Sequence, residues 1–99
     1  MRTMEFDQLI LEAIKVRYAV YQAGGMATKS GVEDVLMHRF GVDRHFAHMV
    51  MNHLEYYSLD STREWTGEGE VPTLADYPEI ELVGRVPRIS VRKEVLVND

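Results

Sequence analysis

Apolar side chains recur at helical spacing in three stretches of the chain, residues 4–22, 31–40 and 44–58. Residues three and four positions apart lie on one face of a helix, so each stretch predicts an amphipathic helix with one buried side. A chain of this size buries a single modest core, which the three apolar faces must share. The side chains expected to meet there are Ile10, Ile14, Leu36, Phe40, Val50 and Leu54.

Local signals mark the ends of these helices. Thr3 is expected to cap the first helix, and Ser30 followed three residues later by Glu33 predicts a capping box at the start of the second. Gly41 is expected to end the second helix in a left-handed conformation, and Asp43 to cap the third. The second and third helices therefore meet at a tight corner.

The pattern changes in the segment 60–81, which is polar, acidic and interrupted by glycine and proline. Such a composition predicts a long loop, with one short helical turn near Leu74 to Tyr77. Because structureless loops of this length are uncommon in compact domains, we expect the loop to be anchored on the core. Its apolar anchors are predicted to be Trp65, Val71, Leu74 and Tyr77.

Apolar and polar residues alternate near the C-terminus, with Ile80 and Leu82 before a glycine- and proline-containing turn at 83–87 and further alternating residues after it. Alternation with a period of two predicts a small β-hairpin. The last run, SVRKEVLV, is also compatible with a short helix, so both interpretations of residues 79–97 stay open.

Together these elements predict a mainly α fold in one domain, residues 1–99: an orthogonal core of three helices with a long acidic loop and a small C-terminal β-hairpin. The chain has no cysteine, and no apolar run approaches the roughly 20 residues needed to cross a bilayer. Glu5 and Asp7 stand where a signal peptide would need an apolar segment. We therefore expect a cytoplasmic protein without membrane association.

Charge is distributed unevenly along the chain, whose formal net charge is −5. Residues 60–81 hold seven acids and one arginine, a local charge of −6, so the remainder carries +1. Arg85, Arg88, Arg92 and Lys93 cluster beyond that segment. A compact protein of this kind presents one acidic and one basic surface, and this asymmetry influences the choice of partner more than the total charge.

The segment 36–50 resembles the helix-turn-helix of bacterial repressors and GntR-like regulators. Apolar residues or glycine fill the required places at Leu36, Phe40, Gly41, Val42 and Val50. Two positions depart from the motif, since Met37 stands where a small residue is usual and Ala47 where a branched aliphatic residue is usual.

If the resemblance holds, the third helix is a recognition helix, on which arginine suits guanine and asparagine suits adenine. The basic hairpin would then be a wing lying on phosphate. Against this, the helix opens with an aspartate and contains one arginine and no lysine, which is little charge for a phosphate contact. The candidate contacts to a nucleic acid or another partner are Arg44, His45, His48, Asn52, Arg85, Arg88 and Arg92.

Histidines and methionines suggest two further kinds of site. His45 and His48 are three residues apart on a helix, but no spacing in the sequence supplies the third ligand that a metal ion would need. We therefore expect no metal and no other cofactor, and we place His53 on the apolar side of its helix. Met37, Met49 and Met51 are interpreted as core residues or as an adaptable partner groove.

Catalytic signatures are not found in the sequence. There is no cysteine nucleophile, phosphate-binding glycine loop or nucleophile elbow, and the glycines of Gly67-Glu68-Gly69 are flanked by acids that would repel phosphate. Glu68 and Glu70 are interpreted as part of a solvated acidic run rather than as a catalytic pair. We expect a protein that is not an enzyme.

The stretches MEFDQLILEAI, YQAGGMATK and VEDVLMHRFGVDRHFAHMVMNHLEYYSLD together resemble the family of small, uncharacterised enterobacterial proteins typified by YoaC. The resemblance spans nearly the whole chain. It implies a mainly helical single domain in the cytoplasm, and it supplies no activity, ligand or catalytic residue.

The leading functional hypothesis is a non-catalytic regulatory or protein-interaction module that binds another protein through its third helix and its tail. DNA binding by a winged-helix-like helix-turn-helix is the alternative, and a homodimer is compatible with either. A DNA reader needs Arg44 and Arg88 on one open face, clear of the acidic loop. We expect the other arrangement, in which the acidic loop lies across the third helix.

Overall fold

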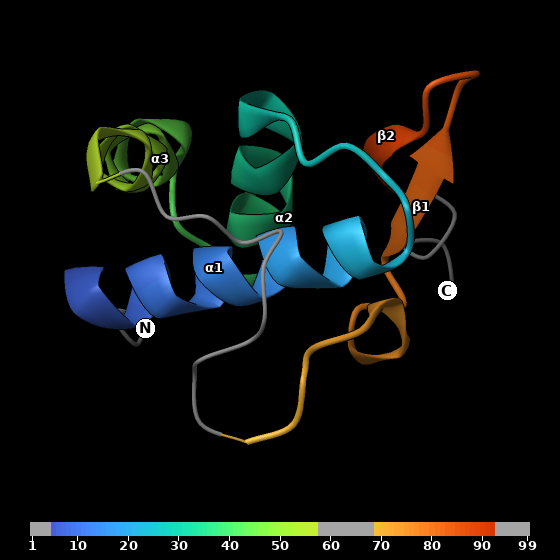
Figure 1. Ribbon diagram of the computed structural model, residues 1–99. Helices are drawn as coiled ribbons and strands as arrows, with labels where there is room; N and C mark the ends of the chain where they lie inside the picture. Colours follow the sequence, from blue (N-terminus) through green and yellow to red (C-terminus); the bar gives the residue numbers. More distant parts are fainter. Residues whose placement is uncertain (1–4, 58–68, 93–99) are drawn as a thin grey trace, which may run out of the picture.

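The computed structural model describes residues 5–57 and 69–92. It contains the helices α1 (Phe6–Gln22), α2 (Lys29–Phe40) and α3 (Arg44–Tyr57), the short 3-10 helix η1 (Leu74–Asp76), and the strands β1 (Ile80–Val83) and β2 (Arg88–Val91). In Figure 1, α1 lies across the view, α2 stands upright and α3 is seen end-on. The predicted mainly α fold with a C-terminal β-hairpin is therefore confirmed.

The apolar faces of the three helices meet in one core, as expected. Leu36, Val50 and Leu54 are fully or almost fully buried in it. The residues of α1 that are most deeply buried differ from the expected Ile10 and Ile14. The apolar stripe of α1 is wide, so a neighbouring part of it faces the core. Its fully buried side chains are Leu9, Ala13, Val16, Ala19 and Val20. Three expected core members are only partly buried and pack against its margin: Ile10, Ile14 and Phe40.

The start of α2 differs from the prediction. Its N-cap is Thr28, whose hydroxyl accepts a hydrogen bond from the Gly31 N–H at 3.1 Å. Ser30 lies exposed inside the first turn, so the predicted capping box of Ser30 and Glu33 is wrong. The Glu33 carboxylate instead bonds to two side chains of α3, and its bond to the Arg44 guanidinium joins two ionised groups.

The corner between α2 and α3 was predicted correctly. Gly41 ends α2 with φ at 72°, in the left-handed region, and its N–H donates to the Met37 carbonyl oxygen at 3.0 Å. Asp43 caps α3, because its Oδ1 accepts a hydrogen bond from the Phe46 N–H at 2.8 Å. The first helix begins after Glu5 without a side-chain cap, and the predicted cap Thr3 lies outside the described residues.

α3 turns one face to the core and the other to solvent. Ala47, Val50, Met51 and Leu54 are buried, in keeping with the predicted stripe. His53 is partly buried on that side, with its ring 5.5 Å from the Phe6 ring in an edge-on arrangement. The expectation that His53 lies on the apolar face is thereby confirmed.

The segment before the hairpin contains the predicted helical turn, η1, which begins with a capping box between Thr73 and Asp76. Tyr77 is buried and Leu74 partly buried, so both anchor the segment as expected. Val71 is 42% exposed and is not an anchor, whereas Trp65 lies outside the described residues.

The hairpin has the predicted alternation. Ile80 lies opposite Val91 and Leu82 opposite Ile89, so four apolar side chains share one face. The strand interpretation is thus confirmed for residues up to 91, and residues 93–97 lie outside the described part of the chain.

The hairpin docks on the helices at two places. β2 packs against α2 at Gly31, where a Cβ atom would lie 2.8 Å from the Cβ of Ile89. Met26, in the connection between α1 and α2, donates its N–H to the Pro87 carbonyl oxygen at 2.7 Å and pairs with Arg88 as an isolated bridge. The glycine at position 31 is therefore required for close packing of the hairpin on α2.

Candidate functional site

A polar cluster joins α2 to the start of α3, and we call it the corner cluster: Glu33, Asp34, Arg44 and His48. Glu33 is only 3% exposed, and its two carboxylate oxygens have different partners. Oε1 accepts from Arg44 Nη1 at 3.0 Å, while Oε2 lies 3.0 Å from Nδ1 of His48. Arg44 Nη2 also donates to Asp34 Oδ1 at 2.5 Å. The buried carboxylate thus positions two cationic or polar side chains of α3.

Arg44 pairs with two carboxylates, those of Glu33 and Asp34. Hydrogen bonds to Asp34 and then to Glu33 raise the pKa of the Arg44 guanidinium, which stays protonated. The side chains of Arg44 and His48 are each 51% exposed, so they remain accessible from solvent while Glu33 holds them. The corner cluster therefore presents a fixed surface of both charge signs.

The predicted contact residues fall into two groups. His45 and Asn52 are exposed on α3 together with Arg44 and His48. The structure therefore brings the four predicted residues of this helix onto its solvent side.

The three predicted arginines of the hairpin lie elsewhere. Arg85 and Arg88 are exposed, whereas Arg92 is partly buried and donates to the Pro78 carbonyl oxygen at 3.1 Å and to Glu81 at 3.4 Å. In Figure 1, α2 stands between α3 and the hairpin, and both pack against it. The two predicted groups of contact residues are therefore separated by a helix.

The acidic segment does not follow the expected course in its described half. Residues 69–81 pack near α1 and the C-terminal end of α2, where Arg39 binds them, rather than across α3. Residues 60–68 lie outside the described part of the chain. Among the described residues, the carboxylates that pair with Arg44 of the α3 surface are those of Glu33 and Asp34, which belong to α2.

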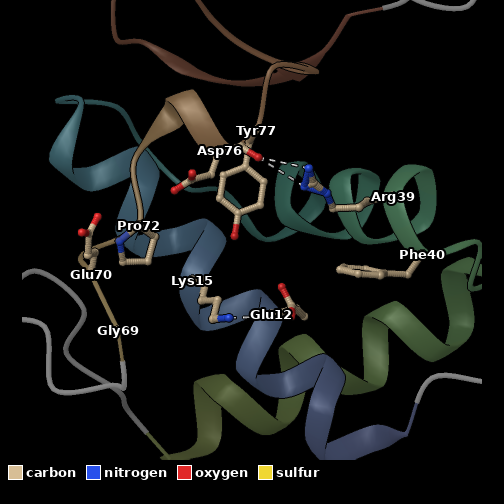
Figure 2. A pocket seen from close by; sticks show the side chains of 9 residues that line it. All are labelled: Glu12, Lys15, Arg39, Phe40, Gly69, Glu70, Pro72, Asp76 and Tyr77. Carbon is tan, nitrogen blue, oxygen red and sulfur yellow. Dashed lines mark hydrogen bonds and ion pairs between the residues drawn. The ribbon is translucent and has the colours of Figure 1, made fainter.

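A second candidate site, missed by the sequence analysis, is a cleft of about 520 Å³ between α1, α2 and the segment before β1 (Figure 2). The side chains around it are mostly charged, and two apolar residues complete the walls. Its lining residues are Glu12, Lys15, Arg39, Phe40, Gly69, Glu70, Pro72, Asp76 and Tyr77.

Arg39 organises one wall of this cleft. Its Nη2 and Nη1 donate to the Asp76 carbonyl oxygen at 3.0 and 3.5 Å, and its guanidinium lies 4.7 Å above the centre of the Tyr77 ring. Its Nε lies 3.4 Å from Oε2 of Glu79. That buried oxygen accepts no hydrogen bond from the described residues, so the charge of Arg39 is what compensates it.

Tyr77 forms the floor of the cleft. Burial, with a further contribution from the negative charge of Glu12, raises the pKa of Tyr77 to about 12. The phenol is therefore uncharged over the whole neutral range, and it can both donate and accept a hydrogen bond.

Metal and membrane sites are not found in the described residues. Among residues 5–57 and 69–92, no three side chains capable of binding a metal ion come together. No helix of these residues is long and apolar enough to cross a membrane.

No family model, curated protein or solved structure matches this chain. The corner cluster and the cleft are the two candidate functional sites in the described residues. The exposed residues of the corner cluster on α3 were predicted from the sequence. The cleft was not predicted, because Arg39 and Tyr77 are far apart in sequence and meet only in the folded chain.

Proposed function

We propose that this protein is a non-catalytic regulatory or protein-interaction module. Its contact surface is the α3 face, defined as the exposed residues Arg44, His45, His48, Met49 and Asn52. The partner is another protein, and a second copy of the chain is one such protein.

The observation that carries this proposal is the fixation of Arg44 and His48 by the buried Glu33. Side chains that are ordered before binding lose less conformational entropy when a partner arrives, and this favours affinity. Met49, 44% exposed, adds an adaptable apolar contact among these polar groups. Arginine, methionine and a mixed polar surround are typical of protein–protein interfaces.

The same cluster weakens the case for DNA. Asp34 and Glu33 lie in contact with Arg44, so phosphate groups approaching this arginine would meet two carboxylates within a Debye length of roughly 8 Å at physiological salt. The basic residues of the hairpin are placed beyond α2 and do not extend the α3 face. A protein surface of mixed charge is the better match for this arrangement.

DNA binding stays the second candidate because of one observation, the short connection between α2 and α3 through Gly41 and Asp43. Two helices joined in this way, with a hairpin later in the chain, have the element order of a winged helix-turn-helix. This proposal requires Arg44 to exchange its carboxylate partners for phosphate.

A photo-crosslinking residue at position 49 tests the leading proposal. Leu11 of α1 is the matched control, because its exposed fraction of 45% equals that of Met49 within one per cent. We expect crosslinks to a defined protein from position 49 and not from position 11. Arg44→Ala and His48→Ala should then weaken binding of that purified protein, since both contribute to the α3 face.

Crosslinks of equal yield from both positions, or none from position 49, would contradict the proposal. A duplex-DNA gel shift supplies the competing test. Steeply salt-dependent binding that is lost in an Arg44→Ala, Arg88→Ala double variant would establish DNA as the ligand, because phosphate contacts release counterions.

A further inference from the structure

The charges around the cleft described above do not cancel. Arg39 donates both Nη groups to the backbone of Asp76 and pairs through Nε with a buried carboxylate, so its charge is already compensated. The remaining ammonium, on Lys15, lies 3.9 Å from a Glu12 carboxylate oxygen, and Glu70 and Asp76 also line the cleft. Three negative groups against one positive group leave the cleft with an excess of two negative charges, which attracts cations.

The Tyr77 hydroxyl is a second and independent feature of the cleft. The residue is 5% exposed, and Figure 2 shows its hydroxyl directed into the cleft toward Glu12 and Lys15 on α1. None of the described residues hydrogen-bonds to this hydroxyl. The hydroxyl oxygen is not among the buried atoms that lack a partner, so it is reached from the cleft, and a ligand bound there can hydrogen-bond to it.

Lys15 already acts as an internal cation of the cleft. Its Nζ lies 3.9 Å from Oε2 of Glu12, and its side chain is 35% exposed. An ion pair this long and this accessible contributes little and is readily exchanged. Phe40 and Pro72 provide apolar walls against which an alkyl chain can pack.

We propose that the cleft binds an organic cation, an ammonium or guanidinium group carried on an alkyl chain. The cation faces Glu12, Glu70 and Asp76, donates one N–H to the Tyr77 hydroxyl, and displaces Lys15. An anion is disfavoured because it would lie among three carboxylates while the donors of Arg39 are occupied. Such a cation is either a free amine or the lysine or arginine side chain of another protein.

Calorimetric titration of the full chain at low salt tests this inference. Cadaverine and agmatine represent free cations, a terminally blocked Gly-Lys-Gly tripeptide represents a protein side chain, and acetate is the anionic probe. We expect the cations to bind and acetate not to bind. Tighter binding of the amines or of the tripeptide distinguishes the two sources, and either result supports the site.

Substitutions of opposite sign make the test specific. Glu12→Gln and Glu70→Gln should each weaken cation binding by about three- to tenfold, while Lys15→Met should strengthen it by a similar factor. Tyr77→Phe should weaken binding through loss of its acceptor. Asp7→Asn is the matched control, because it removes one exposed carboxylate from the first turn of the same helix and should leave affinity within about twofold.

Three results would overturn the inference. The first is the reversed pattern, with acetate binding that weakens in Lys15→Met and strengthens in Glu12→Gln. The second is an equal loss of affinity in Asp7→Asn, which would indicate diffuse attraction rather than a site. The third is failure of every cation to bind a chain whose helical circular dichroism is intact.

Glu70 is exposed, so Glu70→Gln provides a variant in which folding is not at risk. The α3 face takes no part in these measurements, so their outcome is separate from that of the proposed function.

Discussion

Replacing Gly31 with alanine should destabilise the protein, although this change stabilises most helices. Helix propensity alone favours alanine by up to about 1 kcal/mol. In α2, however, the new Cβ would lie 2.8 Å from the Cβ of Ile89 and 2.8 Å from Oγ1 of Thr28. Neither atom is the free end of a flexible side chain, so the hairpin must move away from the helix. Overpacking of this kind costs about 1–3 kcal/mol, so we expect a net loss of about 1–2 kcal/mol.

Urea unfolding followed by circular dichroism measures this effect. The urea dependence of the unfolding free energy is about 1–3 kcal/mol per molar for small proteins, so the midpoint should fall by roughly 0.5–1 M. Ser30→Ala is the control, because it changes the preceding exposed residue in the same turn and should alter stability by less than about 0.5 kcal/mol. A midpoint that rises in Gly31→Ala would refute the close packing of β2 on α2.

Three other predictions follow from single contacts. Thr28→Ala should cost about 0.5–2 kcal/mol of unfolding free energy in urea, more than Ser30→Ala, and equal effects would contradict the cap at Thr28. Leu54→Ala should cost about 2–5 kcal/mol because Leu54 is 1% exposed, and a loss below about 0.5 kcal/mol would show that α3 does not pack on the core. The pKa of Tyr77 is about 10 in the unfolded chain and about 12 in the folded one, so between these pH values only the folded chain keeps the phenol proton. The unfolding free energy should therefore fall as pH rises from about 10 to about 12. Comparison of urea midpoints with Tyr77→Phe checks this, and parallel pH profiles of the two proteins would exclude it.

Sequence reasoning succeeded where one local signal determines the structure. Gly41 and Asp43 mark the corner because the left-handed C-terminus and the N-cap each depend on residues within one helical turn. The hairpin likewise follows from alternation, which places Ile80 and Leu82 opposite apolar partners. The exposed residues of α3 were identified for the same reason, since burial of one helix face implies exposure of the other.

The predictions were wrong where two neighbouring residues could each fill the same role and contacts distant in sequence determine which one does. Thr28 and Ser30 are both good N-caps, and the structure uses Thr28, whose hydroxyl accepts the N–H of the same Gly31 that packs against Ile89. Glu33 satisfies the spacing of a capping box, yet its partners lie 11 and 15 residues further along the chain. The hydrophobic periodicity of a helix does not indicate which distant side chains the Glu33 carboxylate will bind.

The cleft was unpredictable for a related reason. Arg39 and Asp76 are 37 residues apart, and the segment that follows α3 carries no sequence pattern that specifies where it packs. A charged residue at a helix end looks like an ordinary solvated side chain until the segment that covers it is placed.

The hydrogen bond from Met26 to Pro87 makes one backbone amide a reporter of the order in which the protein assembles. The three helices adjoin one another in sequence, whereas this bond and the neighbouring Met26–Arg88 bridge join residues about sixty positions apart. The Met26 side chain is exposed and its connection is irregular, so its amide is shielded from solvent exchange only while the hairpin is docked. Amide exchange at Met26, compared with that of core amides such as Val35, therefore distinguishes detachment of the hairpin from unfolding of the whole domain.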